Sequence, residues 1–169
     1  LWIATVTAQW MKEVNGTHTK VRDTRKTTPG LRELEKYAVR MGGGTNHRMT
    51  LTDGALIKDN HIAAAGSVAQ AIESVKAEFP GIEIEVEVDT LEQLKEALHF
   101  GVDIVLLDNM GIEETKAAVE LAKNSATKLE SSGGLTLENA RAYASTGVDF
   151  LAVGALTHSA PVLDIGLDF

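Results

Sequence analysis

Apolar and polar positions follow a helical rhythm in the first part of the chain. Apolar residues recur at three- and four-residue steps from Ile3 to Val14, which is the spacing of one helix face. This pattern predicts a helix over residues 1–14, closed by an Asn-Gly turn. A second helix is predicted over residues 31–41, with four apolar residues on one side: Leu31, Leu34, Ala38 and Met41.

The rest of the chain alternates short aliphatic runs with helical patterns. Strands are predicted at 55–57, 82–88, 104–107, 127–130 and 150–153, and helices at 67–79, 90–100, 113–124 and 137–146. Ser67 and Thr90 are each followed three residues later by glutamine, which predicts capping boxes at two helix starts. The strand starts recur every ~20–25 residues, as in successive βα units, and such units make a parallel sheet.

A parallel sheet of this kind is either an open doubly wound sheet or a barrel. A complete eight-unit barrel typically needs about 250 residues, and this chain has room for roughly six units. The sequence is therefore equally compatible with an incomplete barrel and with an open sheet. We expect one domain over residues 1–169.

Composition narrows the possible functions. The net charge is −8 with a pI of about 5.1, which argues against a nucleic-acid partner bound through broad electrostatics. The chain has no cysteine, so disulfides, thiolate metal sites and a cysteine nucleophile are excluded, and we expect a cytoplasmic location. No apolar run reaches the roughly 18–20 residues of a membrane span, and we expect no membrane partner. Because the chain starts at Leu1, we expect it to be an isolated domain or a fragment.

Polar residues stand at the ends of the predicted strands. Lys58, Glu87 and Asp108 close three of them, and glycine turns follow the last two at 132–134 and at Gly154. In both parallel architectures the chemistry lies at the carboxyl ends of the strands, so these residues are expected to share one site. Glycine turns there let backbone N–H groups approach a phosphate, although tight turns alone also explain them.

Cations gather on loops of the first half, although the protein as a whole is acidic. They lie in the segments 23–32 (DTRKTTPGLR) and 42–48 (GGGTNHR) and at Lys58. Solvated surface charge is the ordinary explanation of such residues, but cations concentrated on short loops favour a small anionic ligand. The sequence contains no Walker loop, no Gly-x-Gly-x-x-Gly after a strand and no zinc-binding histidine pair at helical spacing.

The order of these motifs resembles one family. The segments 23–32, 42–48 and 56–62 (LIKDNHI) resemble quinolinate phosphoribosyltransferases. So do 85–89 (EVEVD), 105–109 (VLLDN), 132–134 (SGG) and 153–159 (VGALTHS). The resemblance covers nearly the whole chain.

The resemblance implies the type II phosphoribosyltransferase fold, an open α/β barrel. It implies an enzyme that converts quinolinate and 5-phosphoribosyl-1-pyrophosphate to nicotinate mononucleotide, pyrophosphate and CO₂ in NAD biosynthesis. The family also has an amino-terminal domain of roughly one hundred residues. We expect this domain to be absent from this chain, and we expect the family's homodimer or higher oligomer to form through it.

The resemblance also assigns roles to individual residues. Quinolinate would be held by Arg25, His47, Arg48 and Lys58. The phosphoribosyl donor would be held by Lys26, Glu87, Asp108, Ser132, Gly133, Gly134, Gly154 and His158. Mg²⁺ would be held by Glu87 and Asp108, directly or through water. Lys26, Lys58, Glu87 and Asp108 are the expected catalytic residues.

Two other functions stay open. A related phosphoribosyltransferase could act on nicotinate or another carboxylate, although a monocarboxylate needs fewer cations than this chain offers. A domain that binds phosphoribosyl anions without efficient turnover is the second alternative. Glu87 and Asp108 argue against it, because simple anion binding gains nothing from carboxylates beside a phosphate.

Overall fold

The computed structural model describes residues 1–168 as an α/β fold. Its strands are β1 (Lys20–Arg22), β2 (Ala55–Ile57), β3 (Ile84–Val88), β4 (Ile104–Asp108), β5 (Lys128–Ser132) and β6 (Phe150–Ala152). Its helices are α1 (Trp2–Glu13), α2 (Arg32–Met41), α3 (Asp59–Ala65), α4 (Val68–Glu78), α5 (Leu91–His99), α6 (Ile112–Ala122), α7 (Leu137–Ala144) and α8 (Ala155–His158).

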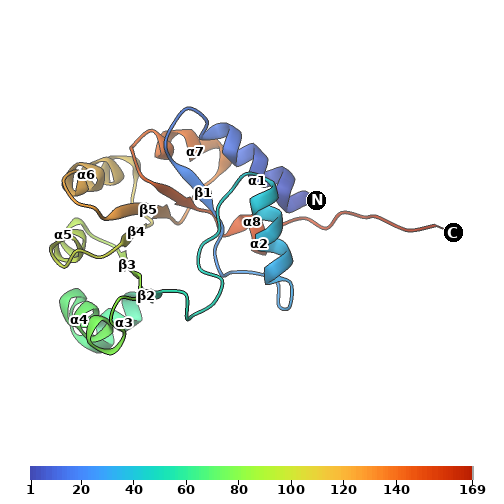
Figure 1. The fold of residues 1–169 in the computed structure, drawn as a ribbon. Helices are drawn as coiled ribbons and strands as arrows, with labels where there is room; N and C mark the ends of the chain where they lie inside the picture. The colour runs from blue at the N-terminus through green and yellow to red at the C-terminus, as the bar shows by residue number, and fades with distance from the viewer. Residues whose placement is uncertain (169) are drawn as a thin grey trace.

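The six strands form one parallel sheet in the order β1-β6-β5-β4-β3-β2. Helices α4, α5, α6 and α7 lie along the outer side of the curved sheet (Figure 1). Because β1 and β2 are the two edges, the barrel is open between them. The expected open barrel is therefore confirmed, and all strands direct their carboxyl ends to the same rim.

Most predicted elements are present with boundaries shifted by one or two residues. The structure also contains three short elements that the periodicity did not predict: β1, α8, and α3, which follows directly after Lys58. The capping-box prediction is half right. Ser67 Oγ and Thr90 Oγ1 accept bonds from the N–H groups of Gln70 and Gln93, but Gln93 Oε1 accepts from the N–H of Asp89 instead of returning to Thr90.

The core lies between the sheet and the outer helices and is aliphatic. Val86, Val105, Leu107 and Leu151 are almost fully buried on the strands and pack with the inner faces of the helices. Alternate strand residues point to opposite faces, so the residues between them face the inside of the barrel.

Helix α2 packs in an unusual way. Leu31, Leu34 and Met41 of the predicted apolar side are exposed to solvent, whereas the charged residues Glu35 and Lys36 are buried. Buried charges require partners, and the loops at the barrel mouth supply them. The helix therefore uses its charged side to hold loops. Among the described residues, no helix is both long and apolar enough to cross a membrane.

Candidate active site

A cavity of about 700 Å³ lies at the carboxyl ends of the strands. All of the predicted site residues line it: Arg25, Lys26, His47, Arg48, Lys58, Glu87, Asp108, Ser132, Gly133, Gly134, Gly154 and His158. The front and back halves of the chain thus contribute to one site. This placement makes their predicted roles possible, and the roles themselves remain predictions.

The cations enter the cavity from the two open edges of the sheet. Arg25 and Lys26 follow β1, and Lys58 follows β2 at the other edge. His47 and Arg48 lie on the segment between α2 and β2, which is tied to the end of β1 by a bridge between Arg22 and Thr45. The acids and the glycine turns come from the central strands. The cations therefore lie at the two edges of the cavity, and the carboxylates and backbone amides lie between them.

Arg25 and Arg48 are held close to each other at this mouth. Burial lowers the pKa of Arg48, and the charge of Arg25 lowers it further. The Nε atoms of both arginines are buried without a hydrogen-bond partner in the described structure, while Arg48 Nη1 donates to the carbonyl of Gly54 at 2.8 Å. Two like charges with unused donors favour an anionic ligand that carries more than one negative charge.

Lys58 and Glu87, at the ends of the neighbouring strands β2 and β3, form an ion pair at the edge of the cavity. Lys58 Nζ lies 2.6 Å from Glu87 Oε2, and the side chains are 44% and 15% exposed. Lys58 directly follows β2, and its ammonium bonds to Glu87 on the neighbouring strand. A ligand that binds either group has to compete with this pair.

The loops after β4 and β5 meet beside Asp108. Asn109 has a φ of 53°, its N–H donates to the carbonyl of Ser132 at 2.9 Å, and its side chain donates to Asp108 Oδ2 at 2.7 Å. Gly133 has a φ of 83°, and a Cβ atom there would overlap the side chain of Asn109. Glycine is therefore required at 133, and the close approach leaves backbone amides free to face a phosphate.

The loop after β6 lies on the same side of the cavity as the glycine turn at 133–134. A Cβ atom on Gly154 would lie 3.1 Å from the ring of His158 and 3.5 Å from Thr24 Oγ1. Thr157 Oγ1 donates to the carbonyl of Lys26 at 2.7 Å. The glycine loop and the Arg25-Lys26 segment are thus packed against each other, so both predicted substrates would meet here.

His47 has a different environment from the one expected for a substrate ligand. Its Nδ1 accepts from the N–H of Arg48 at 2.8 Å, and its Nε2 lies 2.8 Å from Glu85 Oε2 and 3.7 Å from Glu130 Oε1. Both ring nitrogens therefore have protein partners. The ring borders the cavity, and its part in quinolinate binding remains a prediction.

Beneath the cavity lies a buried charged layer inside the barrel. Arg22 Nη1 bonds to Glu130 Oε2 at 2.6 Å, and Glu130 is fully buried. Burial raises the pKa of Glu130 to about 7, with a further contribution from the negative charge of Glu85, against the opposing charges of Arg22 and His47. A proton on Glu130 near neutral pH therefore relieves repulsion between the two carboxylates.

Three polar lining residues were not predicted from the sequence: Thr24, Asn109 and Glu130. Thr24 and Asn109 lie inside the segments that resemble the family, next to predicted residues. The position of Glu130 inside the barrel could have been predicted from the sequence. Acids at alternate positions of 82–89 (IEIEVEVD) and a single acid within β5 indicate strands with one apolar face and one polar face.

The carboxylates fit a hard divalent cation. Glu87 and Asp108 stand at the ends of neighbouring strands and line the same cavity. Two carboxylates leave most coordination positions to water and to substrate phosphates, as Mg²⁺ prefers. The separate group His47, Glu85 and Glu130 also brings three ligand atoms within 4.8 Å, but Arg22 already pairs with Glu130 there.

Together these features define an α/β protein of the open βα-barrel class, with a cavity that combines clustered cations, two carboxylates and glycine loops. The chain matches the family described as quinolinate phosphoribosyl transferase, C-terminal domain, over residues 3–168. It belongs to this family.

Individual relatives agree. The chain is 60% identical over 168 residues to nicotinate-nucleotide pyrophosphorylase [carboxylating] of Mycobacterium leprae and 47% identical over 167 residues to a probable enzyme of that name from Bacillus subtilis. These matches cover 98% of this chain, but only 59% and 57% of the relatives. A crystal structure of nicotinate-nucleotide pyrophosphorylase from Ehrlichia chaffeensis superposes with a TM-score of 0.94 at 47% identity, covering 99% of this chain and 61% of that one. The chain thus spans about three fifths of the length of these relatives.

Proposed function

We propose that this chain is the catalytic part of a quinolinate phosphoribosyltransferase. It joins quinolinate to 5-phosphoribosyl-1-pyrophosphate and releases nicotinate mononucleotide, pyrophosphate and CO₂. The observation that carries this proposal is the meeting of Arg25, Arg48 and Lys58 with Glu87, Asp108 and the glycine loops in one cavity.

The arginine pair supports a dicarboxylate as one substrate. Arg25 and Arg48 have unpartnered buried Nε atoms, and charge-assisted bonds to carboxylates are the strongest use of such donors. Two neighbouring carboxylates would also relieve the repulsion between the two guanidinium groups. Nicotinate, with one carboxylate, would leave part of this charge unpaired.

The opposite side of the cavity suits the phosphoribosyl donor. Gly133, Gly134 and Gly154 offer backbone amides to the 5′-phosphate. Glu87 and Asp108 would accept bonds from the ribose hydroxyls and hold Mg²⁺, while Lys26 faces the pyrophosphate. When bound, Mg²⁺ supplies positive charge that stabilises the departing pyrophosphate.

The reaction then depends on position and charge. The pyridine nitrogen of quinolinate forms a bond to C1 of the ribose as the bond from C1 to the pyrophosphate oxygen breaks, and pyrophosphate leaves with the electron pair. Lys26 neutralises charge on the leaving group. The ring, now cationic, accepts the electron pair when its C2 carboxylate departs as CO₂, and C2 takes up a proton. The chain's own contribution is to orient the substrates and stabilise developing charge.

A product assay tests the proposal. With quinolinate, the phosphoribosyl donor and Mg²⁺, we expect pyrophosphate and CO₂ in equal amounts, with nicotinate mononucleotide identified by chromatography. The assay uses this chain and a version with the length of its relatives, and Lys26→Ala provides the inactive control. Equal turnover of nicotinate would favour the related phosphoribosyltransferase. Binding of both substrates by the longer version without product would favour the binding domain. A homodimer and a cytoplasmic location remain predictions.

A further inference from the structure

A buried ion pair outside the cavity connects helix α2 to the two loops that carry the cations. Lys36 lies in the middle of α2 and has no solvent exposure, and neither has Asp23 at the end of β1. Lys36 Nζ lies 2.5 Å from Asp23 Oδ1. Lys36 does not line the cavity, so it has no direct contact with a substrate bound there.

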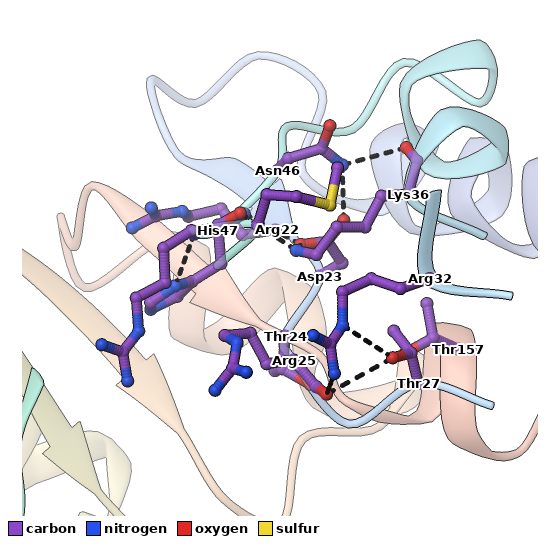
Figure 2. Close-up of polar contacts among 12 residues, drawn as sticks. Arg22, Asp23, Thr24, Arg25, Thr27, Arg32, Lys36, Asn46, His47 and Thr157 are labelled. Carbon is purple, nitrogen blue, oxygen red and sulfur yellow. Dashed lines mark hydrogen bonds and ion pairs between the residues drawn. The ribbon is translucent and has the colours of Figure 1, made fainter. Parts of the chain in front are cut away.

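Asp23 and Lys36 are each bonded to the neighbouring segment 44–48. Asp23 Oδ1 accepts from the N–H of His47 at 2.8 Å, and its other oxygen accepts from the side-chain amide of Asn46. Lys36 Nζ also donates to the carbonyl of His47 at 3.0 Å. Figure 2 shows these side chains converging between the end of β1, helix α2 and the segment at 46–47.

The same helix holds the rest of the first loop. Arg32 Nε donates to Thr27 Oγ1 at 3.0 Å, and its Nη2 donates to the carbonyl of Arg25 at 3.2 Å (Figure 2). Glu35 Oε2 accepts from the N–H of Thr28 at 3.1 Å. Residues 32, 35 and 36 lie on one face of a helix, so one face of α2 fixes the whole segment from 23 to 28.

The position of these bonds in the sequence determines what they control. Asp23 stands two residues before Arg25, and His47 directly precedes Arg48. A shift of Asp23 relative to His47 therefore changes the separation of the two guanidinium groups. Burying a lysine is costly, and burial lowers the pKa of Lys36 against the opposing effect of Asp23. Apolar residues of similar volume often stabilise a fold equally well, so stability alone does not explain this pair.

We propose that Lys36 is a positioning residue that, through Asp23, sets the spacing of Arg25 and Arg48 for a ligand with two adjacent carboxylates. This inference rests on the proposed function for the identity of the ligand, whereas the spacing itself is a property of the free chain. Its direct bonds reach only the two segments that carry Arg25 and Arg48. The glycine loops after β5 and β6 have no bond to Lys36 or Asp23 in the described structure.

The test compares the wild-type chain with the double variant Lys36→Met/Asp23→Asn, which removes both charges together and leaves no unpaired ion. Ile72→Val, a buried change on remote α4, is the control for lost stability. Calorimetry measures the affinity for quinolinate and the affinity for ribose 5-phosphate in separate titrations. We expect the double variant to bind quinolinate about 10- to 100-fold more weakly, the range for a lost hydrogen bond to a charged group, and to bind ribose 5-phosphate as the wild type does. Equal weakening for both ligands, or no change for either, would overturn the proposal.

A second readout needs no ligand. The chain has no cysteine, so spin labels at Thr28→Cys and Thr50→Cys report the distance between the two loops alone. We expect a narrow distance distribution in the wild type and in Ile72→Val, and a broader or displaced one in the double variant. If the wild type does not bind quinolinate, the proposed function fails, and an unchanged distance in the folded variant would separately overturn the positioning role. If the double variant does not fold, Lys36→Arg, which keeps both charges but changes the reach from α2 to Asp23, is measured in the same two ways.

Discussion

Lys58 Nζ and Glu87 Oε2 lie 2.6 Å apart, so the cation expected to bind quinolinate is paired with the carboxylate expected to bind the ribose. In the free chain each group satisfies the other. If quinolinate binds here, its carboxylate competes with Glu87 for Lys58, and Glu87 then becomes more available to the second substrate. The two predicted subsites are therefore connected through a single ion pair.

Substitutions of Lys58 and of Glu87 should change the affinity for quinolinate in opposite directions. Lys58→Met removes a cation and should weaken quinolinate binding about 10-fold or more, as expected for a lost charged hydrogen bond. Glu87→Gln removes the competitor and should tighten quinolinate binding about two- to fivefold, which is the range of a partly exposed ion pair. Calorimetry with quinolinate alone measures both. Lys116→Met, on the exposed surface of α6, is the matched control, and weaker binding in both site variants would contradict the competition.

The arginine pair predicts a strong preference for two carboxylates. We expect nicotinate to bind about 10- to 100-fold more weakly than quinolinate, because one charge-assisted contact is lost. Arg25→Ala should reduce this preference, because Arg48 then stands alone and no longer requires a second negative charge. Competition calorimetry at constant ionic strength gives the ratio. Equal affinity of the wild type for the two acids would refute the assignment.

The glycine at 133 should be required for phosphate binding. Gly133→Ala introduces a Cβ atom at a φ of 83° and against Asn109, so we expect about 1 kcal/mol of lost stability and at least about 10-fold weaker ribose 5-phosphate binding. Gly81→Ala has almost the same φ, 84°, with nothing near its Cβ atom. This control should lose similar stability and keep its affinity. An unchanged phosphate affinity in Gly133→Ala would remove that loop from the site.

Stability should fall with rising pH because of Glu130. Its pKa rises from 4.5 to about 7 on folding, so between these values the folded chain retains a proton that the unfolded chain has released. This contribution to the free energy of unfolding is present below about pH 4.5 and is lost as the pH rises through 7, with a size on the order of 3 kcal/mol.

Glu130→Gln isolates that effect, since glutamine stays neutral. We expect the stability of this variant relative to the wild type to increase between pH 5 and pH 8, measured by urea unfolding at each pH. Glu73→Gln, at an exposed position, should show a constant difference over the same range. A constant difference for Glu130→Gln as well would mean that Glu130 does not carry the proton.

The sequence predicted the architecture well, because the aliphatic runs of β2 to β6 and the helices between them have clear periods. Three elements escaped. β1 is only three residues long, with one apolar residue between two cations, and α3 and α8 are too short for a helical period to show. The open edge of the barrel also depends on β1 pairing with β6, a contact between the two ends of the chain that local patterns do not contain.

The site was predictable as far as its residues lie at strand ends or within the family motifs. The burial of the charged residues that support the site was not predictable from the sequence. Lys36 appears in the sequence as an ordinary polar residue of an amphipathic helix, and its burial depends on Asp23 and His47, which are distant in the sequence. Glu130 is buried for a similar reason, since Arg22 comes from the other end of the chain. Tertiary partners decide which charges a fold can bury.

A crystal structure of the chain with nicotinate mononucleotide tests the central claim most directly, namely that one cavity binds both halves of the product. The account predicts the phosphate at the amides of Gly133, Gly134 and Gly154, the ribose hydroxyls at Glu87 and Asp108, and the carboxylate of the ring toward Arg25 and Arg48. A product bound with its phosphate on the arginines, or bound outside this cavity, would contradict it.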